Sequence, residues 1–241
     1  MLSCGAYASV AGEITQVTLN DLQVVRATLG DAPPAGATGT PVTLELRNVG
    51  SKALSAYEIA LDVTYADGTH VTTAITEDIV YTIALSSVKG ALPTPNATLK
   101  PGETHTVSSL LKLAPSGARA TAVSAKVVTV LSLNRTTAGN EKTIKLILTA
   151  RREQAERLSA MLAKLETVKS SSDQDAAFAN AIAEYDAHID RNDPGQNAKR
   201  RLQAYRDVKD TPESFTFMLH IDKVTAMILK NQSVRYVGGA Q

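Results

Sequence analysis

The chain has four histidines, and histidine is the side chain most often used for acid–base chemistry and metal binding near neutral pH. They are His70, His105, His188 and His220. No two of them stand at the short spacing of paired metal ligands. His70 follows a predicted hairpin turn and His105 follows a Pro-Gly turn, so both could lie at the ends of a sheet and converge on a metal. Two solvated histidines beside turns are the simpler interpretation, and we predict no metal site.

A second candidate for chemistry is the polar segment around Asp190. Asp190 and Asn192, followed by Gly195, resemble the beginning of a calcium-binding loop. Pro194 occupies the next ligand position, however, and Arg201 stands where such a loop needs a bidentate Glu. Because those two oxygen ligands are missing, we interpret the segment as the end of one helix and the capped start of the next.

A group of basic residues follows, and it could bind phosphate or RNA. The group consists of Lys199, Arg200, Arg201 and Arg206. Asp207 and Asp210 stand close behind and balance its charge. We therefore interpret it as the solvated face of a helix.

The chain lacks the short motifs that accompany common enzyme chemistries. It contains no G-x-S-x-G, H-E-x-x-H, G-x-G-x-x-G or P-loop pattern. Its one cysteine, Cys4, excludes an internal disulfide and a cysteine-rich metal cluster. We predict no catalytic residue, no cofactor and no metal, and we favour a protein that is not an enzyme.

Charge and composition narrow the classes of partner. The net charge is +1, which supplies no long-range field for nucleic acid or anionic lipid. Aromatic residues make up 4% of the chain and Trp is absent, which argues against stacking platforms for sugars or single-stranded nucleic acid. The longest apolar runs are shorter than the roughly 18–20 residues of a membrane span. We expect a protein partner, no nucleic acid partner and no transmembrane segment; the residues do not indicate the partner's identity or the number of copies that assemble.

The elements that would position any site begin with a strongly β-like region, residues 14–149. Val42, Leu44 and Leu46 alternate with polar residues, the period of a strand with one buried face. The same period continues from Tyr57 to Tyr65, and a hairpin signal follows at Asp67-Gly68. Further strands are predicted at 14–19, 22–29, 70–75, 79–85, 104–113, 122–133 and 142–149. Short strands at this spacing predict an immunoglobulin-like antiparallel β-sandwich and favour it over a barrel.

Beyond Thr149 the hydrophobic period changes to that of helices. Residues 150–235 are predicted to form a bundle of about four helices, with residues 1–13 and 236–241 as a disordered or processed N-terminus and a flexible tail. Asp193-Pro194 and Thr211-Pro212 have the capping pattern that opens a helix. The predicted apolar stripes are Leu158, Met161, Leu162, Leu165 and Val168; Phe178, Ile182, Tyr185 and Ile189; Ala198, Leu202, Tyr205 and Val208; and Phe217, Met218, Ile221, Val224 and Ile228. Met227 is assigned to the bundle core together with Phe217 and Met218.

Turn residues in the β region carry a resemblance to a known class of domain. The segments are Asn48 to Tyr57, Tyr65-Ala66-Asp67-Gly68, and Leu99-Lys100-Pro101-Gly102-Glu103. Over about residues 20–149 the chain resembles bacterial extracytoplasmic immunoglobulin-like domains, the FxLYD-type and the proteinase-inhibitor BsuPI-like modules. The resemblance implies the sandwich fold and an extracytoplasmic protein. No catalytic residue and no inhibitory reactive loop carries over, and the Cys pair and Trp of antibody domains are absent.

The N-terminus contains a second indication of export. Ala6-x-Ala8 has the small-residue pattern of a signal-peptide cleavage site, and Leu2-Ser3-Cys4-Gly5 is similar to a lipoprotein cysteine region, although Leu2 is one residue too close to Cys4. An ordinary disordered N-terminus is the alternative, because no basic start and no long apolar stretch precede the pattern. We expect an extracytoplasmic protein that is periplasmic, secreted or lipid-anchored.

Two hypotheses about function follow. The first is a non-enzymatic interaction or structural protein whose sandwich presents loops or an edge strand to a protein partner. The second is a hydrolase or other enzyme with a site at the sandwich–helix junction, where His105 or His188 would act with nearby Asp residues. A pocket at the junction with a histidine and carboxylates within hydrogen-bond reach would favour the second hypothesis.

Overall fold

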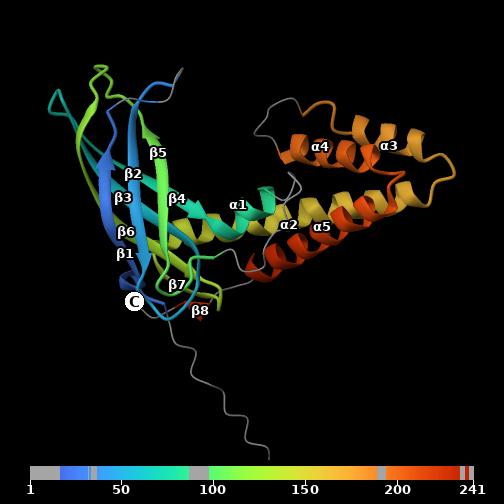
Figure 1. Cartoon of the computed structure of the whole chain (residues 1–241), viewed down its shortest axis with the longest axis horizontal. Coiled ribbons are helices and arrows are strands. Elements are labelled where there is room, and N and C mark those ends of the chain that lie inside the picture. The colour runs from blue at the N-terminus through green and yellow to red at the C-terminus, as the bar shows by residue number, and fades with distance from the viewer. Residues whose placement is uncertain are drawn as a thin grey trace, which may run out of the picture.

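A β-sandwich and a projecting arm of helices make up the molecule (Figure 1). The computed structural model of the chain describes residues 17–31, 33, 37–86, 98–188, 194–233 and 237–238. The strands are β1 (Leu22–Leu29), β2 (Thr40–Asn48), β3 (Leu54–Tyr65), β4 (His70–Asp78), β5 (Thr104–Leu111), β6 (Ala120–Ser132), β7 (Thr136–Gly139) and β8 (Val237–Gly238). The helices are η1 (Leu19–Asp21), α1 (Ile79–Ser86), α2 (Glu141–Lys169), α3 (Gln174–Ala183), α4 (Pro194–Asp207) and α5 (Pro212–Ser233).

The strands form two sheets that face each other. The first has the order β1-β2-β5, and the second has the order β4-β3-β6-β7-β8. All neighbouring strands are antiparallel except the two-residue β8, which pairs in parallel with β7. The predicted fold class, an antiparallel β-sandwich followed by helices, is confirmed.

The alternating residues of β2 and β3 build the sandwich core, as predicted. Leu44 and Leu46 on β2, and Tyr57, Ile59 and Leu61 on β3, are all inaccessible to solvent. Burying one such side chain stabilises the fold by about 1.5–3 kcal/mol. The core residues therefore keep the two sheets together.

Buried Asn48 organises the turn region on which the family resemblance depends. Its Nδ2 donates to the carbonyl oxygens of Lys52 and Leu99, at 2.7 Å each, and its Oδ1 accepts from the backbone N–H of Gly50. Its own carbonyl accepts from the N–H of Gly102, whose φ of 80° belongs to the left-handed region that glycine favours. One asparagine therefore fastens the β2–β3 turn to the Pro-Gly turn before β5.

Two predicted strands are helices, and these predictions are wrong. Residues 79–85 lie in α1, and residues 142–149 lie in the first turns of α2. Asn140 caps α2, because its Oδ1 accepts from the backbone N–H groups of Lys142 and Thr143. Helix α2 therefore starts directly after β7 and runs on into the arm as one continuous element.

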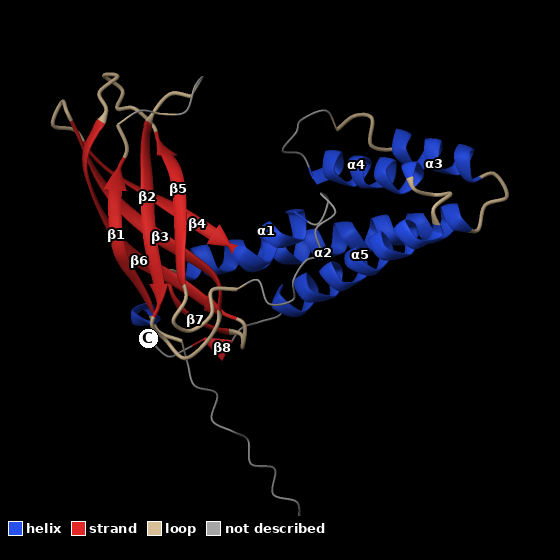
Figure 2. Cartoon of the chain, viewed as in Figure 1, coloured by secondary structure: helices blue, strands red, loops and turns tan. Residues whose placement is uncertain are grey.

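The arm consists of α2 and α5 side by side, with α3 and α4 at its far end (Figure 2). The predicted stripe of the first helix is confirmed, since Leu158, Met161, Leu162, Leu165 and Val168 are all buried. Phe178 and Ile182 of α3 are buried, as are Leu202 and Tyr205 of α4. Ile189 lies outside the described residues. The starts of α4 and α5 agree with the two capping patterns.

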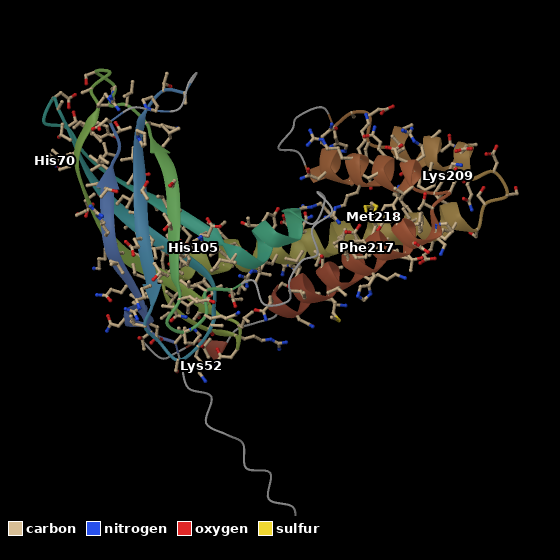
Figure 3. All side chains as sticks on the ribbon, in the orientation of Figure 1. Lys52, His70, His105, Lys209, Phe217 and Met218 are labelled. Carbon is tan, nitrogen blue, oxygen red and sulfur yellow. The ribbon has the colours of Figure 1, made fainter. Side chains whose placement is uncertain are left out.

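The buried face of α5 differs from the predicted one. Phe217 is 43% exposed and Met227 is 55% exposed, so neither belongs to the bundle core; Met218 is half-buried (Figure 3). Ile221 is buried as predicted, and the other buried positions include Phe215, Asp222 and Leu229, seven residues apart from one to the next. Because successive helical residues turn by about 100°, the two-residue step from Phe215 to Phe217 moves a side chain to the opposite face.

Candidate functional site

One edge of the second sheet is formed by β4, which pairs with β3 and with no other described strand. Its register with β3 is unbroken from His70, opposite Thr64, to Asp78, opposite Ala56. Residues 70–74 are all exposed. β4 is therefore a regular edge strand that is open to solvent on both faces over much of its length.

The hairpin turn determines which backbone groups of β4 are free. The N–H of Tyr65 donates to the carbonyl of Thr69 across the turn, and bonded pairs then recur at every second residue. The backbone N–H and C=O groups of Val71 therefore hydrogen-bond to those of Val63. The carbonyl of Thr64 points the other way, because it accepts from the Thr121 hydroxyl on β6. The residues of β4 whose N–H and C=O groups point away from β3 are His70, Thr72, Ala74 and Thr76.

β4 lacks the features that usually prevent edge strands from pairing with other chains. Such features are Lys or Pro in the strand, a bulge, or inward-pointing charge. The sequence His-Val-Thr-Thr-Ala-Ile-Thr-Glu-Asp has no Lys and no Pro, and its register with β3 shows no bulge. Its two acids, Glu77 and Asp78, stand only at the end that meets α1. Most of the edge can therefore accept another strand without removing a charge from water.

A shallow hollow of about 300 Å³ lies beside this edge, on the outer face of the second sheet. It is lined by Asp62, Val63, Thr64, His70, Val71, Thr72, Ala122, Val123 and Ser124. Its outward-facing side chains are mostly small alcohols and alanine, with a single carboxylate. Figure 3 shows His70 at the end of the sandwich remote from the helical arm.

Local hydrogen bonds hold the polar side chains of this outer-face hollow. The Thr72 hydroxyl donates to Oδ1 of Asp62 at 2.7 Å, and Nδ1 of His70 lies 3.1 Å from Oγ1 of Thr64. Among the described residues, Oδ2 of Asp62 accepts no hydrogen bond. The hollow therefore presents one open carboxylate oxygen among hydroxyl groups. Sequence reasoning missed Asp62, although the alternating pattern of β3 already predicts that its side chain points outward.

The sandwich–helix junction contains an ion pair where the enzyme hypothesis places a histidine. Arg151 of α2 is fully buried, and its guanidinium contacts both carboxylate oxygens of Asp78. It also donates to the backbone carbonyls of Ser55 and Gln232, at 3.2 Å each. Arg151 is buried because α2 packs against β3 and β6 at this point, where Ile147 clusters with Ala56 and Leu131.

The histidines of the enzyme hypothesis lie in different parts of the fold. Nδ1 of His105 is 3.1 Å from the hydroxyl of Tyr57, inside the edge of the sandwich. Burial, with a smaller contribution from Glu77, raises the pKa of Tyr57 above its ordinary value of 10.0. His188 follows α3 and its ring lies against Tyr185, with ring centroids 5.9 Å apart. The structure therefore does not bring His105 and His188 together.

The basic group of α4 is divided among several acidic partners. Arg201 is buried and pairs with Asp222 of α5, so its assignment to a solvated face is wrong. Burial lowers the pKa of Arg201 to about 10, and the Tyr205 hydroxyl donates to the same Asp222 at 3.0 Å. Lys199 pairs with Asp186 at 2.8 Å. These contacts tie α4 to its neighbours in the bundle.

Several sequence predictions fall outside the described residues. Asp190, Asn192 and the N-terminal segment around Cys4 are among them. Within the described ranges, no group of three or more His, Cys, Asp or Glu side chains is placed to hold a metal ion. No described helix is both long and apolar enough to cross a membrane.

Comparisons with known proteins find little similarity. No family model matches the chain, and no curated protein matches it. One solved X-ray structure, of a hypothetical protein from Peptoclostridium difficile 630, is 12% identical and covers 53% of this chain and 90% of its own. Its TM-score is 0.31, which is too low to support an argument about fold or function.

Proposed function

We propose that this protein is a non-enzymatic, extracytoplasmic interaction protein that binds a protein partner by adding the partner's strand to β4. The observation that carries the proposal is the free edge formed by the outward backbone groups of His70, Thr72, Ala74 and Thr76. In strand addition, such groups supply affinity through main-chain hydrogen bonds, and side-chain contacts on the sheet face supply specificity.

The shape of the molecule supports this use of the sandwich. Helix α1 follows β4 at Asp78 and contacts α5 of the arm, and the exposed residues 70–74 stand at the opposite end of the strand (Figure 1). β1 and β5 are the edge strands of the first sheet, and β5 is also uncharged. β4 is favoured because the outer-face hollow lies beside it.

A proline substitution tests the proposal. Ala74→Pro removes an outward N–H and leaves the N–H groups that bond to β3 in place, because proline is tolerated in edge strands where the N–H faces solvent. Ala74→Thr is the matched control, since it changes the side chain and keeps the N–H. The experiment cross-links each chain to its neighbours in an envelope fraction of its source and identifies the captured proteins by mass spectrometry. We expect the proteins captured by the wild type to be lost with Ala74→Pro and kept with Ala74→Thr. Equal capture by both variants would overturn strand addition at β4.

The extracytoplasmic part of the proposal is supported by the family resemblance and by Ala6-x-Ala8 in the sequence. Its test is the intact mass and cell fraction of the native protein. A chain that starts at Ser9, or one lipidated on Cys4, agrees with export. A full-length chain in the cytosol contradicts it.

A further inference from the structure

The hollow beside β4 contains a carboxylate, that of Asp62, of which only one oxygen accepts a hydrogen bond from the described residues. Asp62 is exposed on the outer face of β3. The Thr72 hydroxyl donates a hydrogen bond to its Oδ1, and its Oδ2 accepts no hydrogen bond from the described residues. Lys126 stands on the same face of β6, opposite Ala60, but forms no ion pair with Asp62. A cation supplied from outside would meet one open acceptor surrounded by hydroxyl groups.

The side chains between Asp62 and the free edge are small. Thr72 lies opposite Asp62, and Ala74 lies opposite Ala60, the next outward position of β3. A strand added to β4 would lie about 10 Å from β3, because neighbouring strands are about 4.8 Å apart. Lys and Arg have apolar stems long enough to cross β4 over Ala74 and still carry a charge to Asp62.

We infer that the strand added to β4 carries a Lys or Arg side chain that crosses β4 on the outer face and pairs with Asp62. This inference rests on the proposed strand addition and specifies the chemistry of the partner. The occupant is an extended segment, free of acidic side chains on that face, with one basic residue near the middle of the paired stretch. Backbone pairing supplies most of its affinity, and the Asp62 contact selects among segments.

The test uses synthetic peptides as probes for the full-length chain. Each has the nine-residue length of β4, alternates Thr and Val, and carries Lys, Arg, norleucine or Glu at its central position. Peptides are fixed singly on an array, which prevents them from pairing with each other. The chains compared are the wild type, Asp62→Asn, Ala74→Pro and the control Ala74→Thr.

The expected result is binding that is about fivefold tighter for the Lys and Arg peptides than for the norleucine peptide, the effect of one partly exposed ion pair. Asp62→Asn keeps binding to the norleucine peptide and loses the preference. Ala74→Pro binds none of the peptides, and Ala74→Thr, which keeps the backbone N–H, still binds the norleucine peptide.

Two other kinds of result would contradict either the role of Asp62 or strand addition at β4. If the wild type binds all peptides alike, or if Asp62→Asn keeps the preference for Lys and Arg, the role of Asp62 is overturned and strand addition stands. If no peptide binds, or if Ala74→Pro binds as the wild type does, strand addition at β4 is overturned and the inference falls with it.

Discussion

Arg151 and Asp78 form a bidentate ion pair that joins helix α2 to the end of strand β4. Nε of Arg151 donates to Oδ2 of Asp78 at 2.9 Å, and Nη2 donates to Oδ1 at 2.8 Å. Oδ1 of Asp78 also accepts from the backbone N–H of Tyr81 at 3.1 Å, so the same carboxylate caps α1. One acidic side chain thus fixes β4, α1 and α2 relative to one another. This contact therefore holds the last residue of β4 against the base of the arm.

Substitutions at Asp78 are expected to separate its two roles. Asp78→Asn keeps a good helix cap and leaves the buried Arg151 without its counter-charge, which costs about 3–5 kcal/mol of unfolding free energy. Asp78→Ala also removes the cap and costs about 1 kcal/mol more. Urea unfolding followed by circular dichroism measures both. The control is Asp207→Ala, whose exposed pair with Arg206 is worth about 0–1 kcal/mol. Equal effects at Asp78 and Asp207 would mean that the junction pair does not hold the arm.

The direction of the β4 backbone groups predicts opposite outcomes for prolines at adjacent positions. Thr73→Pro removes an N–H that bonds to β3, and we expect a loss of about 1 kcal/mol or more, roughly 3 °C in the melting temperature. Ala74→Pro removes an outward N–H and is expected to leave the melting temperature nearly unchanged. Thermal unfolding of the two variants distinguishes them. A reversed order would show that the free backbone groups belong to the other residues of the strand.

The two phenylalanines at the start of α5 are expected to differ sharply in their contributions to stability. Phe215 is 9% exposed and packs edge-on against Tyr205, with ring centroids 5.1 Å apart. Phe215→Ala should cost about 3–5 kcal/mol, because it opens a cavity in the bundle. Phe217→Ala should change the unfolding free energy by no more than about 0.5 kcal/mol. Denaturant unfolding of both variants checks the assigned face, and a larger loss at Phe217 would contradict it.

Alkaline pH is expected to destabilise the sandwich through Tyr57. The pKa of Tyr57 in the fold lies above its ordinary value of 10.0, so the folded state retains a proton that the unfolded state releases. The resulting stabilisation is complete below pH 10.0 and is lost as pH rises toward the pKa in the fold. Above pH 10.0 the wild type should lose about 1.4 kcal/mol per pH unit more than Tyr57→Phe does. The measurement is unfolding free energy against pH for both chains, and parallel curves would refute the role of Tyr57.

Sequence reasoning succeeded where a regular period coincided with burial. The alternating Val42, Leu44 and Leu46 and the helical stripe from Leu158 to Val168 are buried as predicted. In such segments a single periodic pattern is sufficient to identify both the element and its inward face.

It failed where two periods compete in a short apolar run. Ile144, Leu146 and Leu148 alternate as in a strand, yet Leu146 is 62% exposed on a helix that buries Thr143, Ile147 and Arg151. The cap at Asn140 was the local signal that could have decided between them.

The buried charges could not be found from the sequence. Arg151 and its partner Asp78 are separated by 73 positions, and arginine is rarely buried without a partner. The candidate site depends on similar long-range information. Only the order of strands in the sheet shows that β4 is an edge, and only its neighbours place Asp62 in a hollow beside that edge.

The most direct test of the central claim is amide hydrogen exchange of β4, measured residue by residue by NMR with and without the lysine peptide. In the free protein, Val71, Thr73 and Ile75 should be protected, and Thr72, Ala74 and Thr76 should exchange rapidly. Saturation with the peptide should slow exchange at Thr72, Ala74 and Thr76. Binding of the peptide with unchanged exchange at those three amides would contradict strand addition at β4.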